Sequence, residues 1–251
     1  MKTVAIAIAL LLLFGAARLP YEIHLSKVQQ AAGFRTTNLN LPLREQVGQM
    51  GFVAALSGFR SLVAAFLWIE AHNAWMKVEW GRMAGLLDTV TTLQPKSVLY
   101  WDMSAWHMAW NAAIAAFQDP DQPSEVLRRR AQRQYWELGK KFYDDGLKAN
   151  PDSAQLWERL AILERDKFED HAAAAQAFLT SASKPGARPY VRRMAAYELA
   201  KIPGREQEAY DLLKNLYDEG PDERKPALIL ALKQLEEKLG VPADQRIKET
   251  K

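Results

Sequence analysis

The chain contains no cysteine. This absence excludes disulfide bonds, cysteine-ligated zinc, a thiol nucleophile and a lipidated cysteine. The formal net charge is only +3 over 251 residues, which is too small to indicate a nucleic-acid partner. Proline and glycine are scattered and build no low-complexity tract, so most of the chain is expected to fold.

Motifs of the common enzyme classes are also missing. The sequence has no P-loop, no dinucleotide fingerprint, no HExxH and no GxSxG. His72 with Met76, or His107 with Met103, could ligate haem or copper, but Met and Trp at helical spacing more often fill a core. We therefore expect a non-enzymatic protein with no catalytic residue, no metal site and no cofactor.

Long apolar runs are scarce, and the clearest one lies at the N-terminus. Lys2 is followed by an apolar run over residues 4–17, which is typical of an export signal. Residues 1–20 are predicted to remain as a membrane anchor or to be cleaved as a signal peptide. With the N-terminus inside, we expect a single-pass protein of the bacterial inner membrane whose soluble domain lies outside the cytoplasm. Cleavage would instead give a periplasmic or secreted protein.

The remainder is rich in helix-forming residues and poor in β-branched ones, which predicts an all-α fold. We divide it into a spacer at residues 21–46, a helical domain at 47–240 and a frayed tail at 241–251. A second membrane span at residues 46–69 is an alternative to a buried helix pair there, but Arg60 and Glu70 would be costly in lipid.

A repeat is the strongest signal in the helical domain. Prolines that separate helical stretches recur at intervals of 56, 34 and 36 residues, at Pro95, Pro151, Pro185 and Pro221. A small residue often lies twelve positions before such a proline, where it would let two helices approach closely. Counting back in this way gives Met83, Gly139, Ala173 and Ala209, with Ala161 a further twelve residues before Ala173.

This pattern of an early tryptophan, paired small residues and a terminal proline resembles the tetratricopeptide repeat, most clearly over residues 152–185. The stretches 58–68, 93–95 and 105–111 are similar to membrane-anchored bacterial repeat proteins of unassigned role. The resemblance implies a right-handed solenoid of about four helix pairs, with a capping helix at 223–239. The unit at 96–151 is about 22 residues too long, which predicts longer helices around a loop at 118–123.

The first two repeats contain more tryptophan than packing requires. Since the first helix of each pair lines the groove of such arrays, we predict an aromatic groove that binds a peptide or helix of a protein partner in a membrane complex. Folding of residues 21–57 into the groove is the competing interpretation. A periplasmic carrier of an apolar molecule such as a lipid, quinone or haem is the alternative function. The predicted groove residues are Trp68, His72, Trp75, Met76, Asp102, Trp106 and Trp110.

A basic run is the densest cluster of charge. It is interpreted either as a contact for anionic lipid or an acidic partner, or as the solvated face of a long helix. Its residues are Arg128, Arg129, Arg130 and Arg133.

Overall fold

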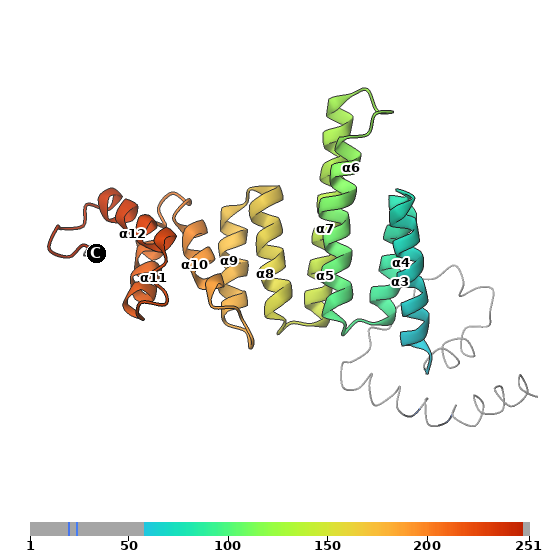
Figure 1. Ribbon diagram of the computed structural model, residues 1–251, viewed down its shortest axis with the longest axis horizontal. Helices are drawn as coiled ribbons and strands as arrows, with labels where there is room; N and C mark the ends of the chain where they lie inside the picture. Colours follow the sequence, from blue (N-terminus) through green and yellow to red (C-terminus); the bar gives the residue numbers. More distant parts are fainter. Residues whose placement is uncertain (1–19, 21–23, 25–57, 248–251) are drawn as a thin grey trace, which may run out of the picture. The chain divides into compact units, whose positions relative to one another are not determined.

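The fold is that of a computed structural model, which describes residues 58–247 together with Pro20 and His24 (Figure 1). All regular structure within these residues is helical, which confirms the all-α prediction. The helix predicted at residues 1–20 and the spacer at 21–46 lie outside the described residues, apart from Pro20 and His24. The chain divides into two compact units, residues 1–94 and residues 95–251, and each is described by itself.

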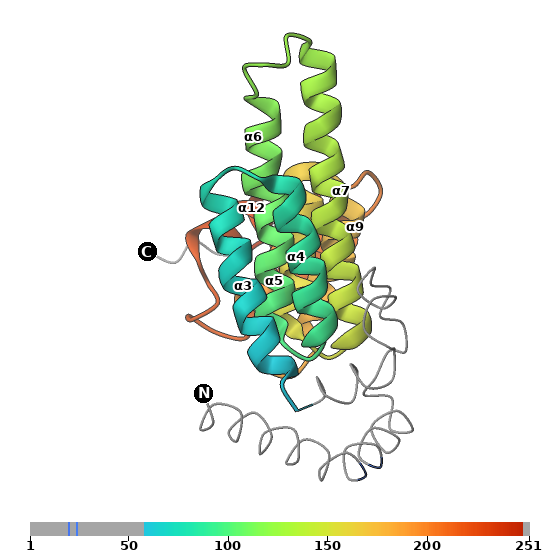
Figure 2. The ribbon, with the colours of Figure 1, turned by 90° about the vertical axis from the view of Figure 1, so that its right-hand side faces the viewer.

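The described part of the first unit is a helical hairpin (Figure 2). Helix α3, Arg60–Met76, packs against helix α4, Trp80–Leu93. On α3 the buried residues are three alanines, whose small side chains allow a close approach of the two helices. These are Ala64, Ala71 and Ala74, and the large apolar residues of α4 fill the space beside them.

The second unit is a series of helices in which neighbours along the chain are also neighbours in space (Figure 1). Two of its helices continue directly into short π-helical segments, η2 and η3. The elements are α5 Val98–Trp106, η2 His107–Ala112, α6 Ala113–Phe117, α7 Glu125–Ala149, α8 Ala154–Leu163, η3 Glu164–Phe168, α9 His171–Ala182, α10 Tyr190–Leu199, α11 Glu206–Asp218 and α12 Pro226–Lys238.

Helices α5 and α8 begin in the same way, 56 residues apart. Ser97 and Ser153 cap the two helices, each accepting a hydrogen bond from a backbone N–H in the first turn. Four residues later, Trp101 donates its indole N–H to the Pro95 carbonyl at 2.9 Å, and Trp157 donates to that of Pro151 at 3.1 Å. These matching bonds show that the sequence repeat corresponds to a structural repeat at these two positions.

Close packing of α7 against the chain before it depends on glycine. A Cβ atom on Gly139 would lie 2.6 Å from the Cβ of Ala109 and 2.8 Å from the carbonyl oxygen of Ala105. One on Gly146 would lie 2.8 Å from the Cγ of Trp101. The close approach that the proline spacing predicts at Gly139 is therefore confirmed. At the equivalent place in α9 the fully buried alanines are Ala174 and Ala175, beside the predicted Ala173.

The extra residues of the long repeat extend a helical hairpin. Helix α6 and the first half of α7 project beyond the neighbouring α8 and α9, as both ribbon views show. The turn between them covers residues 118–124, which agrees with the predicted loop at 118–123.

The C-terminal end is closed by α12. Three of its leucines enter the last apolar cluster, together with Leu213 and Leu216 of α11, as expected for a capping helix. Residues 241–247, which the sequence predicts to be frayed, fold back so that the Ile247 N–H donates to the buried carboxylate of Glu236 at 2.7 Å. The three leucines of α12 are Leu228, Leu232 and Leu235.

Candidate functional site

A buried carboxylate marks the middle of α5. Asp102 follows Trp101 directly and is 7% exposed. Its oxygens accept hydrogen bonds from the Tyr143 hydroxyl of α7 at 3.1 Å and from Gln155 Nε2 of α8 at 2.8 Å. The guanidinium of Arg159, also on α8, lies 3.5 Å from the same carboxylate. Because a buried polar group is costly unless it is paired, these contacts compensate for the burial of the Asp102 side chain and join α5, α7 and α8.

The equivalent position of the next repeat carries a second buried carboxylate. Glu158 follows Trp157 and is 2% exposed. It accepts a hydrogen bond from the Tyr190 hydroxyl of α10 and pairs with Arg188 at 3.2 Å. The side chains of Arg159 and Arg188 are 39% and 54% exposed, so the anions lie inside while the cations reach solvent.

Two exposed apolar residues lie on α5 beside this polar network. Leu99 is 60% exposed and Trp106 is 41% exposed. They are seven residues apart and share a helix face with Asp102, three residues after Leu99. We name the set formed by Leu99, Asp102, Trp106, Gln155 and Arg159 the α5–α8 surface. It combines apolar area with an accessible cation.

Tyr143 supplies a test of the network through pH. Burial, followed by the charge and hydrogen bond of Asp102, raises the pKa of Tyr143 above its ordinary value. The neutral phenol therefore stabilises the folded state below a pH of about 10, and this contribution is lost as pH rises further, because the unfolded chain ionises first. We expect the stability advantage of the parent over Tyr143→Phe to shrink between pH 8 and pH 11 in urea unfolding. An advantage that grows with pH would contradict this assignment.

The predicted aromatic groove combines residues of both units. Trp68, His72, Trp75 and Met76 lie on α3 of the first unit, where the rings of His72 and Trp75 are 5.1 Å apart. Asp102, Trp106 and Trp110 belong to the second unit. Each unit is described by itself, so a groove formed by both remains a prediction.

Trp106 and Trp110 differ in their surroundings although they are four residues apart. Trp106 is exposed and its ring stands edge-on to His107 at 5.1 Å. Trp110 is partly buried, with the Lys167 ammonium of η3 5.3 Å from its ring centre. Segment η2 begins between them, and its wider turn changes the direction of the side chains that follow. On the second unit, Trp106 is thus the more accessible of the two.

Two of the four arginines of the basic run form ion pairs along α7. Arg129 pairs with Glu125 at 2.7 Å and its guanidinium lies over the ring of Phe117. Arg133 pairs with Glu137 and lies over Phe168, and Arg128 donates to the Gln122 carbonyl. Arg130 is exposed. This pattern favours the solvated-face interpretation over an anion site.

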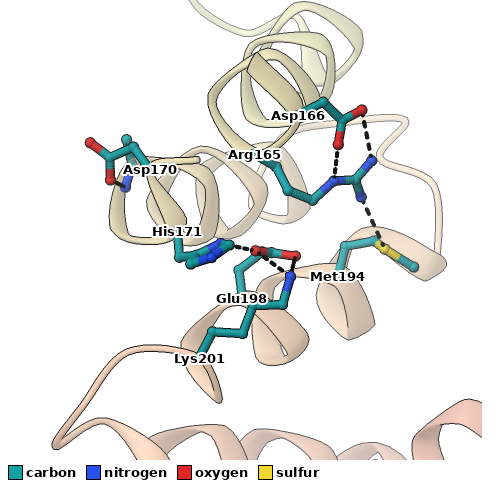
Figure 3. Close-up of polar contacts among 8 residues, drawn as sticks. Arg165, Asp166, Asp170, His171, Met194, Glu198 and Lys201 are labelled. Carbon is teal, nitrogen blue, oxygen red and sulfur yellow. Dashed lines mark hydrogen bonds and ion pairs between the residues drawn. The ribbon is translucent and has the colours of Figure 1, made fainter. Parts of the chain in front are cut away.

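A third buried carboxylate lies between α9 and α10 (Figure 3). Glu198 is 2% exposed and lies 2.7 Å from Nδ1 of His171 and 2.9 Å from Nζ of Lys201. Nearby, Arg165 forms a two-bond pair with Asp166 and approaches the sulfur of Met194. Across residues 58–247, no group of three or more His, Asp or Glu side chains is placed to hold a metal ion.

Sequence reasoning missed most of the polar residues of these networks. Asp102 was predicted from its place among the tryptophans, but its partners come from other helices. The repeat itself contains a signal, because Asp102 and Glu158 both lie seven residues after a repeat proline. The missed residues are Tyr143, Gln155, Glu158, Arg159, Arg188 and Tyr190.

Two further findings bear on what the chain is. Among the described residues, no helix has the length and apolar character needed to cross a membrane. Comparison of the chain with protein-family models, with curated proteins and with solved structures gives no match.

Proposed function

We propose that the chain is a non-enzymatic scaffold of the tetratricopeptide-repeat type, a right-handed solenoid that binds a protein partner. The observation that carries this proposal is the repeated start of α5 and α8, with a serine cap and an indole-to-proline bond in each. Packing between successive helices supports it, because a solenoid stacks each repeat on its neighbours. Such arrays bind peptides or helices on their surfaces.

The α5–α8 surface is the proposed contact on the second unit. Trp and Arg are the residues most enriched at binding hot spots, and here Trp106 and Arg159 lie around one buried anion. Because Asp102 and its partners join three helices, the surface is held in place before a partner arrives, which reduces the entropy lost on binding. An amphipathic segment with an apolar side chain and a carboxylate would complement it.

A membrane location completes the proposal. It rests on the sequence alone, on Lys2 and the apolar run at residues 4–17. In this proposal residues 1–20 anchor the protein in the bacterial inner membrane, and the helical domain binds its partner outside the cytoplasm.

The test removes the apolar part of the surface. We expect Leu99→Ala with Trp106→Ala to weaken partner capture by about 2 kcal/mol or more, roughly 30-fold, because hot spots lose this much when truncated. Helicity should stay unchanged, since neither side chain is buried in the core. The measurement is quantitative mass spectrometry of proteins that co-purify from membranes with the tagged full-length chain.

The matched control is Leu230→Ala. Leu230 is 59% exposed on α12, so its truncation matches the Leu99→Ala half of the double variant at a distant place. It should leave capture unchanged. If the double variant folds and keeps the partners that the parent captures, the recognition surface lies elsewhere.

A further inference from the structure

Helix α3 carries the most continuous exposed apolar face among the described residues. Four large apolar residues of α3, together with its N-cap residue Phe59, are each more than half exposed. A single exposed apolar side chain is ordinary, but a row of them along one helix marks an interaction surface. These residues are Phe59, Leu62, Phe66, Ile69 and Met76.

Their spacing is that of a coiled-coil seam. The steps along the chain are three, four and three residues, and Asn73 fills the one remaining position before Met76. Alternating steps of three and four are the a and d positions of a heptad. The buried alanines Ala64 and Ala71 lie at the f positions and face α4, on the opposite side of the helix. Helix α3 therefore has one face for its own hairpin and a second face with the spacing that receives another helix.

Asn73 indicates that the helix received by this second face is α3 of another copy of the chain. In this heptad it occupies an a position, where a single asparagine fixes the register of a parallel pair by facing its counterpart. Asn73 is partly buried and its amide donates to Glu70 on the same helix at the long distance of 3.4 Å. A second amide across the seam would pair with it better than lipid would.

We propose that α3 of one chain pairs in parallel with α3 of a second copy. The seam is short, and five such side chains offer roughly 500 Å² per copy, below the ~800 Å² of a standard stable interface. We therefore expect a weak association in solution, strengthened where membrane attachment concentrates the chains. Self-association needs no partner protein and goes beyond the proposed scaffold function.

The absence of cysteine makes the test direct. Leu62→Cys and Met76→Cys are prepared separately in the full-length chain, purified in detergent micelles and oxidised mildly with copper phenanthroline. In a parallel, in-register pair each position faces itself, so each variant alone should give a disulfide-linked dimer on a non-reducing gel. Leu230→Cys, with similar exposure on α12, should remain monomeric.

A second measurement uses no cross-link. Phe66→Glu should lower the dimeric fraction, measured by light scattering after gel filtration, at least fivefold at equal concentration, because it places like charges across the seam. Its circular dichroism should match the parent, since Phe66 is largely exposed.

Three results would overturn the proposal. A dimer that forms only when the two cysteine variants are mixed would show antiparallel pairing. Monomers whose cysteines resist maleimide in micelles would show that the chain itself covers the seam. Monomers whose cysteines react with maleimide in micelles but are protected in lipid vesicles would show that the bilayer covers it. None of these outcomes depends on partner capture, so they leave the scaffold proposal to its own test.

Discussion

Replacing Trp101 with alanine should lower the free energy of unfolding by about 3–5 kcal/mol, the usual cost of truncating a buried tryptophan. Trp101 is 8% exposed, and its ring lies against Gly146, where a Cβ atom would come within 2.8 Å of it. Its indole N–H donates to the Pro95 carbonyl, which also accepts from the side chain of Asn150. The substitution therefore leaves a cavity between α5 and α7 and removes one of the bonds that fix the start of α5.

Two companion variants separate these effects in urea unfolding followed by circular dichroism. Trp101→Phe keeps most of the ring and loses the hydrogen bond, so it should cost only about 1–2 kcal/mol. Trp157→Ala should cost less than Trp101→Ala, because Trp157 makes the matching bond but is only partly buried. A Trp101→Ala protein as stable as the parent would show that this tryptophan does not hold the repeat together.

Gly139→Ala should destabilise the chain by about 2 kcal/mol or more, although alanine is the better helix former by about 1 kcal/mol. The new Cβ would lie 2.8 Å from the Ala105 carbonyl oxygen and 3.0 Å from the Ala109 nitrogen. Both are backbone atoms of the facing helix, so relief requires that α7 move away. Overpacking should therefore outweigh the gain in helix propensity.

Gly85→Ala is the matched control. Gly85 also lies inside a helix, α4, but a Cβ atom there would meet nothing within 4 Å. Only the higher helix propensity of alanine then affects stability, so this variant should be as stable as the parent or up to about 1 kcal/mol more stable. Thermal and urea midpoints should fall for Gly139→Ala and should stay level or rise for Gly85→Ala. If both rise, the helices at Gly139 are not as close as the structure places them.

The projecting hairpin and the capping helix were predictable because their signals are local. Prolines at the ends of helices, an excess of residues between Pro95 and Pro151, and leucines at helical spacing in α12 each appear within a few turns of sequence. The same locality explains why Gly139 could be identified as a close-packing position. Backbone capping and side-chain periodicity determine these features whatever lies on the other side of the helix.

The chemistry of the α5–α8 surface depended on the tertiary structure. Asp102 is satisfied by Tyr143, 41 residues away, and by Gln155, 53 residues away, and no local pattern connects such partners. Segments η2 and η3 could not be predicted either, because a π-helical turn has no amino-acid composition of its own. The sequence by itself determined where helices begin and end, and which leucines of α12 are buried. Packing decided which charges are paired and which aromatic side chains reach solvent, because burial is set by what lies opposite a residue and not by the residue itself.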